Sequence, residues 1–219
     1  MPFNPGFVEE IARRRIALRE ELAPHFAAPR SIVWEVGCGH GHFLASYATQ
    51  HPDRFCIGVD LSRDRIARAN RKSSRAQLSN CRFVQCEARE FLRALSPKTM
   101  LEEIWLLFPD PWPKKRHHKN RIIQHEFLEA IAARAGQGAR LFFRTDHSQY
   151  FAAALEVFVA SKTWFITPGA AWPQELPTVF QVRAQSYQSL AAVRTGHPAT
   201  PGETTAPGLP LPAGPTSVA

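Results

Sequence analysis

The chain has 219 residues, of which 44% are hydrophobic and 21% are charged, so it can bury the core of one ordinary domain. It contains no signal-peptide pattern and no apolar run of bilayer-spanning length, and we therefore expect a cytoplasmic protein without membrane contact. The formal net charge of +8 does not define a fold, but it favours an acidic partner such as nucleic acid if the basic residues are clustered.

The first 29 residues are predicted to form a helical segment ahead of the main domain. Phe7, Ile11, Leu18 and Leu22 recur at the spacing of an amphipathic helix, with the basic run Arg13–Arg15 beside them. The first β-branched run follows directly, so we place the start of the main domain at residue 30.

Residues 30–190 alternate short β-branched or aliphatic runs with helical segments. The expected strands are Ile32–Val36, Phe55–Asp60, Arg82–Gln85, Ile104–Leu107, Arg140–Arg144 and Thr178–Tyr187. The expected helices are His42–Gln50, Ser62–Arg75, Ala88–Leu95, Asn120–Arg134 and Ser148–Ser161. This alternation is typical of βαβ units, and it predicts an α/β domain whose mostly parallel sheet is covered by helices on both faces.

A glycine-rich turn joins the first expected strand to the first expected helix of this domain. It reads Glu35-Val-Gly-Cys-Gly-His-Gly41, so Gly37, Gly39 and Gly41 let the backbone approach a ligand closely. A dinucleotide fingerprint would read GxGxxG and present a helix N-terminus to a pyrophosphate, whereas this loop reads GxGxG and follows Glu35. A carboxylate there attracts a cation, so S-adenosylmethionine, with its sulfonium and α-ammonium groups, fits better than NAD. A merely structural glycine turn is the alternative.

Acidic residues also follow the next three expected strands. Asp60 ends the second strand and can accept both ribose hydroxyls, Glu87 follows the third and can reach an adenine amino group, and Asp110 follows the fourth. The carboxyl ends of neighbouring parallel strands form the ligand-binding edge of open α/β sheets, so we expect these acids to gather there. Each has a structural alternative, because Asp60 could cap the helix near Ser62 and Glu87 could lie in the first turn of the next helix.

The stretch after the fourth expected strand combines prolines with basic residues. Pro109, Pro111 and Pro113 exclude a helix or a central strand, so a stiff loop is predicted. The run that follows comprises Lys114, Lys115, Arg116, His117, His118, Lys119 and Arg121. Together with Trp112, it is suited to contact phosphates and to stack on a base, although a solvated basic loop is the alternative.

One more acid, Asp146, follows the fifth expected strand at the same predicted edge. It is equally compatible with a functional role and with capping the helix that begins near Ser148.

Residues 191–219 crowd proline, glycine, threonine and alanine together with few large apolar side chains. Such a segment cannot offset its own ordering entropy, so a disordered tail is predicted, and the folded part is expected to end near Ser189.

The four cysteines form no CxxC pair. Cys81 and Cys86 with His117 and His118 could in principle hold zinc, but their spacings match no familiar ligand pattern. We therefore expect small buried thiols and no metal site.

With these motifs in view, residues 30–187 resemble the bacterial tRNA (guanine-N7-)-methyltransferase family. The resemblance rests on Glu35–Gly41, Gly58–Asp60, Glu87-Ala88, Phe108–His117 and Thr145-Asp146, and the run Phe108-Pro-Asp-Pro-Trp-Pro-Lys-Lys-Arg-His117 is its most specific part. It implies a Rossmann-like class I methyltransferase fold with a seven-stranded sheet. It also implies S-adenosylmethionine as methyl donor, tRNA as partner and N7 of a guanine in the variable loop as the methylated atom.

The resemblance also assigns site residues. It implies that the glycine loop binds the cofactor together with Glu35, Asp60, Glu87 and Asp110, and that Asp110 is catalytic as well. The residues implied or expected to bind substrate are Lys114, Asp146, Thr178, Gln181, Trp112 and Arg116.

One family element is altered in this chain. The family's Thr-Lys-Phe-Glu is here Thr178-Val-Phe-Gln181. An amide in place of the carboxylate has one acceptor and an unwanted donor facing guanine N1–H and N2–H₂, which weakens that contact.

Three other functions stay open at this point. The Val179 and Gln181 replacements permit a catalytically impaired relative that binds tRNA or cofactor without turnover. A methyltransferase for another RNA or for a small molecule is the second, although the basic loop disfavours a small molecule. An NAD oxidoreductase is the third, and the glycine spacing disfavours it. Both a monomer and a homodimer are compatible with the sequence.

Overall fold

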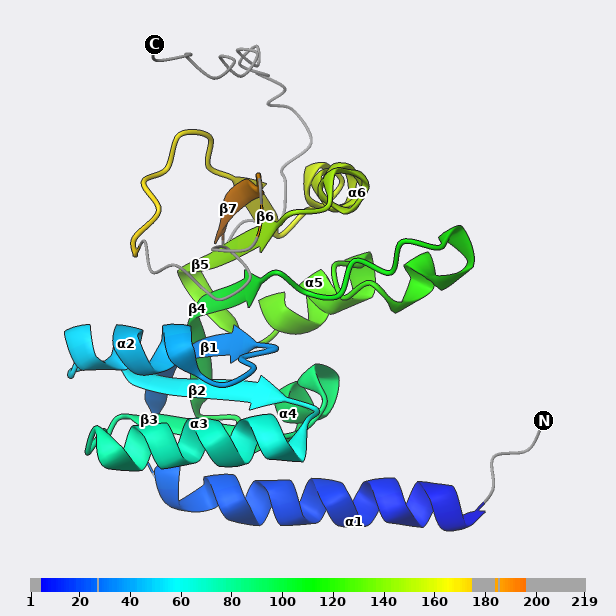
Figure 1. Cartoon of the computed structure of the whole chain (residues 1–219). Coiled ribbons are helices and arrows are strands. Elements are labelled where there is room, and N and C mark those ends of the chain that lie inside the picture. The colour runs from blue at the N-terminus through cyan, green and yellow to red at the C-terminus, as the bar shows by residue number, and fades with distance from the viewer. Residues whose placement is uncertain (1–4, 27, 175–183, 185, 196–219) are drawn as a thin grey trace.

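The structure is a computed structural model that describes residues 5–26, 28–174, 184 and 186–195. Within these residues, one sheet has the strand order β3-β2-β1-β4-β5-β7-β6 (Figure 1). Its strands are β1 Arg30–Val36, β2 Phe55–Asp60, β3 Cys81–Gln85, β4 Thr99–Leu107, β5 Ala135–Thr145, β6 Trp164–Ile166 and β7 Gln188–Arg194. Strands β1 to β5 are parallel, and β7 is antiparallel to both β5 and β6. This confirms the mostly parallel seven-stranded sheet.

Helices cover both faces of the sheet, as expected. They are α1 Pro5–Leu22, α2 His42–Gln50, α3 Arg63–Arg75, α4 Ala88–Ala94, α5 His125–Ala132 and α6 Ser148–Val159, with short 3-10 turns η1 Ala23–His25 and η2 Lys115–Asn120. Side chains alternate along a strand, so Ile32 and Trp34 enter the core shared by α1, α4, α5 and α6, whereas Val33 enters the core shared by α2 and α3. Glu35 follows the same alternation and lies on the α2/α3 face.

The parallel register places the ends of five strands along one edge. Glu35 of β1 is paired in register with Gly58 of β2 and with Trp105 of β4, and Leu107 at the end of β4 is paired with Arg144 of β5. We call this the carboxyl edge and the opposite one the amino edge. The loops that leave β1, β2, β3, β4 and β5 therefore all start at the carboxyl edge.

The last two strands differ from the prediction. Most of the predicted strand Thr178–Tyr187 lies outside the described residues, and Ser186 and Tyr187 are not in a strand. Strand β7 begins at Gln188 and continues to Arg194, past the end expected near Ser189, and the short β6 was not predicted. The two strands form an antiparallel pair. In β7 only Leu190 and Ala192 are buried, and two such positions are too few to predict a strand from the sequence.

The helical boundaries agree with the prediction to within two residues except at one helix. The predicted helix Asn120–Arg134 is shortened to α5, because Arg121 has extended backbone and turns its guanidinium back toward Pro111. The first predicted helix is present as α1, and Leu18 and Leu22 are buried in the core. Among the described residues, no helix combines the length and the hydrophobicity needed to cross a membrane.

Candidate functional site

Acidic side chains line the carboxyl edge at the end of every parallel strand. Glu35 is the next-to-last residue of β1 and Asp60 is the last residue of β2, and both side chains are buried. Glu87 and Asp110 follow β3 and β4 within three residues, and Asp146 directly follows β5. The structure therefore brings together the five acids that were singled out from the sequence.

The glycine loop between β1 and α2 has left-handed backbone at all three glycines, with φ values of 74°, 53° and 65° at Gly37, Gly39 and Gly41. A Cβ added to Gly37 or Gly39 would meet no atom within 4 Å, whereas one added to Gly41 would lie 2.5 Å from Phe83 Cζ. Gly41 is thus required for packing. Gly37 and Gly39 leave open space above the loop, which a ligand can occupy.

Glu35 is a buried carboxylate that lacks a matching cation. Its side chain is 4% exposed, and its Oε2 has no hydrogen-bond partner among the described residues. The pKa of Glu35 is raised to about 8, chiefly by burial and also by the charge of Asp60, while the Leu44 amide and Lys72 oppose this shift. Lys72 lies nearby but donates its Nζ hydrogen bond to the His40 carbonyl at 2.9 Å. A buried carboxylate without its partner is costly unless a bound cation completes it.

Asp60 organises the loop and keeps capacity for a ligand. Its Oδ2 accepts a hydrogen bond from the Gly39 amide at 3.0 Å, and its Oδ1 accepts one from the Ser62 amide at 2.8 Å. The cap of α3 is Ser62 itself, so Asp60 is not the N-cap that was considered. Each carboxylate oxygen has a second lone pair, so Asp60 can still accept hydroxyl hydrogen bonds.

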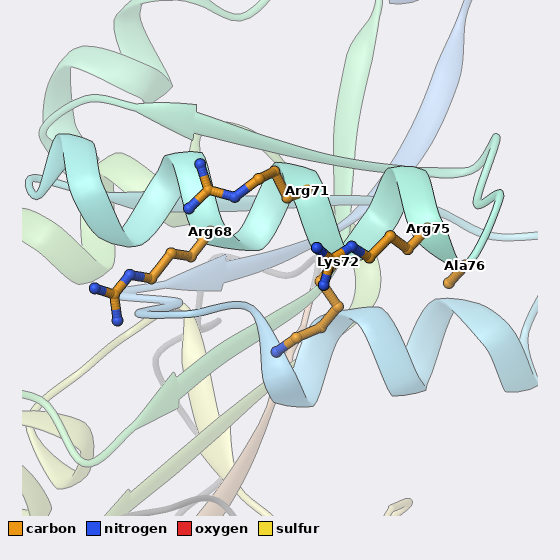
Figure 2. A pocket seen from close by; sticks show the side chains of 5 residues that line it. All are labelled: Arg68, Arg71, Lys72, Arg75 and Ala76. Atoms are coloured by element: carbon orange, nitrogen blue, oxygen red, sulfur yellow. The ribbon is translucent and has the colours of Figure 1, made fainter.

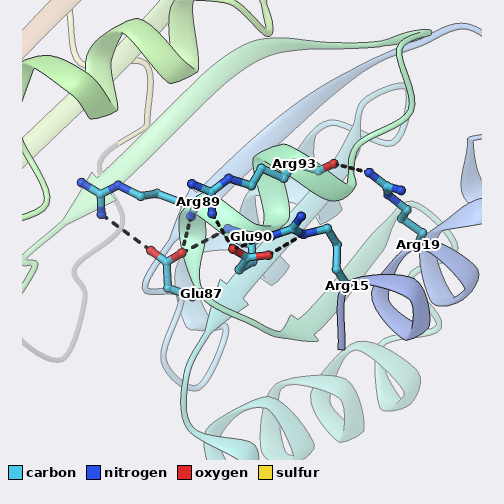
Figure 3. Close-up of polar contacts among 6 residues, drawn as sticks. All are labelled: Arg15, Arg19, Glu87, Arg89, Glu90 and Arg93. Carbon is cyan, nitrogen blue, oxygen red and sulfur yellow. Dashed lines mark hydrogen bonds and ion pairs between the residues drawn. The ribbon is translucent and has the colours of Figure 1, made fainter. Parts of the chain in front are cut away.

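Glu87 caps α4. Its Oε2 accepts hydrogen bonds from the Arg89 and Glu90 amides at 2.8 and 3.1 Å, and its Oε1 lies 3.8 Å from the Arg89 guanidinium (Figure 3). Glu87 therefore has the structural role that was considered as an alternative, but only through Oε2 and as the N-cap of α4 instead of a residue in its first turn. Oε1 accepts no hydrogen bond within the described part of the chain and remains available to a ligand.

A network of arginines joins α1 to α4 just behind Glu87 (Figure 3). Arg15 donates two hydrogen bonds to Glu90, at 2.8 and 3.2 Å, and Arg19 donates one to the Arg93 carbonyl at 3.2 Å. We call these contacts the α1–α4 brace. Arg15 belongs to the basic run Arg13–Arg15, and the structure engages its side chain inside the protein.

The proline-rich and basic stretch leaves β4 at the carboxyl edge. We call residues 108–121 the strap. Phe108 and Trp112 adopt positive φ values of 51° and 45°, which is strained for large side chains and is found most often at functional sites. Asp110, Lys114 and Arg116 are exposed, so their charges are accessible on the strap.

Trp112 and Arg121 are less exposed than the charged strap residues Asp110, Lys114 and Arg116. Trp112 is half-buried with its ring edge-on to His117 at 5.8 Å between centroids. Arg121 is 3% exposed, donates a hydrogen bond to the Pro111 carbonyl at 2.8 Å and lies 4.9 Å over the Tyr150 ring. Arg121 is therefore a buried anchor of the strap on α6, and counting it among the phosphate-contacting residues was wrong.

Asp146 is exposed at the start of α6. The cap of that helix is His147, whose Nδ1 accepts a hydrogen bond from the Tyr150 amide at 3.2 Å, so the capping alternative for Asp146 is wrong. The remaining expected substrate residues, Thr178 and Gln181, lie outside the described residues.

Two functional candidates were not found by sequence reasoning. Lys72 reaches the glycine loop from α3, and no local motif marks it. Arg144 is buried at the end of β5, lies 4.0 Å beneath the Trp172 ring and donates a hydrogen bond to Ser189 at 2.8 Å. The signal for Arg144 was a charged residue directly after the apolar run Leu141–Phe143.

The cysteines are mostly small buried side chains, as expected. Cys38, Cys56 and Cys81 are buried and Cys86 is partly buried, and burial raises the pKa of Cys56 and of Cys86 to about 12. Such thiols are poor nucleophiles. No group of three or more potential metal-ligating side chains occurs in the part of the chain that the structure describes.

The strand order, the glycine loop and the acids at the carboxyl edge define a class I methyltransferase fold. A solved structure described as an rRNA methylase from Streptococcus thermophilus matches it with a TM-score of 0.53 at 14% identity, over 84% of this chain and 95% of its own. At that identity the likeness concerns the fold alone.

Sequence comparison identifies the family within this class of methyltransferases. Residues 29–197 match the family described as "Putative methyltransferase". The tRNA (guanine-N(7)-)-methyltransferase of Halorhodospira halophila is 36% identical over 78% of this chain and 72% of its own, and that of Thermotoga maritima is 36% identical over 64% and 45%. The chain belongs to the family of these tRNA (guanine-N(7)-)-methyltransferases. It spans about half the length of several of these relatives.

Proposed function

We propose that this protein transfers a methyl group from S-adenosylmethionine to N7 of a guanine in tRNA. The observation that carries the proposal is the unpartnered, buried Oε2 of Glu35 beside a glycine loop with open space above it. A dinucleotide cofactor would bring anionic phosphates to this carboxylate, whereas S-adenosylmethionine brings an ammonium and a sulfonium. The named activity of relatives at 36% identity supports the same function.

The residues at the carboxyl edge fit this methyl donor in charge and hydrogen bonding. Glu35 would hold the ammonium group, Asp60 the ribose hydroxyls, and Glu87 the adenine amino group through its unused Oε1. Gly37 and Gly39 would let the backbone approach the donor closely. When bound, S-adenosylmethionine supplies an electrophilic methyl group on its sulfonium.

The substrate half needs little acid–base chemistry. Guanine N7 carries an in-plane lone pair and no proton, so no base must remove a proton before methyl transfer. The protein contributes positioning and negative charge that compensates the positive charge developing on the purine. Asp110 on the strap is our candidate for that charge, and Asp146 across the same edge would fix the guanine edge.

The exposed basic residues of the strap would hold the RNA. Lys114 and Arg116 would contact phosphates, and the face of Trp112 would stack on a base. Thr178 and Gln181 would complete the base pocket. The amide of Gln181 is the reason to keep an impaired, tRNA-binding relative as the second candidate function.

The test of the proposal is Asp110→Ala against a matched control, Asp53→Ala. Both side chains are exposed, but Asp53 precedes β2 at the amino edge. We expect Asp110→Ala to lower kcat/KM for unmodified tRNA by about 100-fold or more, because it removes a preorganised charge, and Asp53→Ala to leave it unchanged. Product is mapped as 7-methylguanosine by mass spectrometry, and near-normal turnover in Asp110→Ala would reject the role of Asp110.

A wild-type protein that makes no 7-methylguanosine in tRNA would reject the enzymatic function itself. Titration calorimetry with adenosylhomocysteine then distinguishes the second candidate. An impaired relative would bind this product analogue without turnover, whereas a protein of another class would not bind it.

A further inference from the structure

Helix α3 carries a concentration of positive charge, most of which is engaged neither within the fold nor in the proposed catalytic site. Its 13 residues hold six basic side chains and one acid, a net charge of +5 out of +8 for the whole chain. Arg68, Arg71, Lys72 and Arg75 recur at i, i+3, i+4 and i+7, so they share one side of the helix. We call these four residues the α3 stripe, and Figure 2 shows their side chains around the hollow that they line.

The arginines of the α3 stripe are not neutralised within the protein. Arg68, Arg71 and Arg75 form no ion pair with any acid among the described residues, and all three are exposed. Like charges three and four residues apart repel each other. Lys72 and Arg75, in the last turn, are favoured by the helix dipole, but Arg68 and Arg71 are not. The folded protein alone thus gains nothing from the charges of Arg68 and Arg71.

The α3 stripe is continuous with the proposed cofactor site. Lys72 donates its hydrogen bond to His40 in the glycine loop, and Arg65, one turn before the stripe, lies 3.7 Å from Asp60. The hollow lined by the stripe is open and has a volume of about 740 Å³. From Arg68 to Arg75 the helix rises about 10.5 Å, a length over which a nucleic-acid duplex presents about six phosphates.

We propose that the α3 stripe binds the sugar-phosphate backbone of the tRNA substrate, as a second contact surface separate from the strap. The inference rests on the proposed function for the identity of the RNA. Charge complementarity carries it, since three of the four stripe residues, Arg68, Arg71 and Arg75, present exposed guanidinium groups that have no ion pair among the described residues, and such groups contact phosphates. A backbone contact carries no base specificity, so the stripe would orient the tRNA while the strap reads the target base.

The test compares two double variants that remove the same charge. Arg68→Gln with Arg71→Gln changes the middle of the stripe, where glutamine has a helix propensity like that of arginine. Lys98→Gln with Lys162→Gln changes two exposed residues at the amino edge. The measurement is Kd for unmodified tRNA as a function of potassium chloride concentration, with Tm and calorimetry with adenosylhomocysteine in parallel.

Losing two phosphate contacts should lower the salt slope of log Kd by about 1.4 to 1.8 and weaken binding about 10-fold or more at 0.15 M salt. In the stripe variant we expect KM for tRNA to rise, while kcat, the affinity for adenosylhomocysteine and Tm stay at wild-type values. The control variant should keep the wild-type slope.

Equal salt slopes in the two double variants would overturn the inference, whether or not the wild-type protein methylates guanine. Loss of binding to phosphatidylserine vesicles with unchanged tRNA binding would also overturn it. A reduced slope in the stripe variant of a protein that makes no 7-methylguanosine would support the RNA surface and reject the proposed function alone.

Discussion

Two buried glutamates on the same face of the sheet have opposite surroundings. Glu35 on β1 and Glu103 on β4 lie on adjacent strands and both face α2 and α3. Glu103 accepts hydrogen bonds from Tyr47 at 2.8 Å and from Arg54 at 2.5 Å, and it is also paired with Arg140. Glu35, two positions nearer the carboxyl edge, has an oxygen without any partner in the described part.

The pKa values reflect this difference. Burial raises the pKa of Glu103, but the hydrogen bond from Tyr47 and the charges of Arg140 and Arg54 outweigh it and lower the pKa overall. At Glu35 burial dominates and raises the pKa to about 8. The charge of Glu103, in the middle of β4, is thus neutralised within the fold, whereas Glu35 near the carboxyl edge keeps an oxygen without a partner in the described residues. The predictions below follow from this contrast.

The largest expected effect is on cofactor affinity. Glu35→Gln should weaken binding of adenosylhomocysteine by about 30-fold or more, because removing one member of a buried charge pair costs about 2 kcal/mol or more. Asp53→Asn, an exposed acid at the amino edge, is the control and should bind normally. Calorimetry measures both, and equal affinity in the two variants would contradict the assignment of Glu35.

Glu103 should affect the stability of the fold and not the affinity for the cofactor. Glu103→Ala should lower the free energy of unfolding by about 2 to 3 kcal/mol, below the full value for a buried pair because Arg54 and Arg140 reach solvent. Its neighbour Glu102→Ala, whose carboxylate is 43% exposed and 3.4 Å from Arg54, should change it by less than about 1 kcal/mol. Urea denaturation compares them. Cofactor affinity should stay normal in both variants. Equal free energies of unfolding in the two variants would contradict the structural role of Glu103.

The stability of the cofactor-free protein should depend on pH through Glu35. The folded pKa of about 8 lies above the ordinary value of 4.5, so the folded state is penalised as pH rises through this window and fully so above about 8. Glu35→Gln removes the penalty. Its Tm should match wild type at pH 4, below the unfolded pKa, and exceed it by about 3 °C or more at pH 9, equivalent to about 1 kcal/mol. A constant Tm difference between pH 4 and pH 9 would show that Glu35 does not titrate there.

The smallest effect concerns the strap. Lys114→Gln should lower the salt slope of tRNA binding by about 0.7 to 0.9 and weaken binding about 5-fold at 0.15 M salt, because one phosphate contact is lost. Lys98→Gln is the charge-matched control at the amino edge. Filter binding over a range of salt concentrations measures both variants. An unchanged salt slope in Lys114→Gln would show that Lys114 does not contact a phosphate.

Sequence patterns sufficed for those parts of the site that depend on local spacing. The glycine spacing, the acids after successive strands and the prolines of the strap all follow from near neighbours in the chain, and the parallel sheet then aligns them. Burial of a charged side chain is different, because it depends on contacts between distant segments. The pairing of Arg121 with Pro111 and Tyr150 and the missing partner of Glu35 arise only when α6 and α2 pack onto the sheet.

The residues that cap helices are also difficult to predict from the sequence. Asp60 and Asp146 each lie next to a helix start, and the side chains that cap those helices are Ser62 and His147. Residues within one or two positions of a helix start compete for the cap, and local backbone geometry selects the winner. Strand β6 was missed because it has only three residues, and β7 because its two buried positions, Leu190 and Ala192, carry little periodic signal.

The α1–α4 brace connects the helix at the beginning of the chain to Glu87, the residue proposed to bind adenine. Arg15 and Glu90 are separated by 75 positions, and Glu90 donates its amide to the cap oxygen of Glu87. A chain shortened to begin after Arg15 would keep its glycine loop and its strap but lose the outer tether of α4. If Glu87 binds the adenine as proposed, the length of the leading helix would affect cofactor affinity without altering any residue of the proposed substrate site.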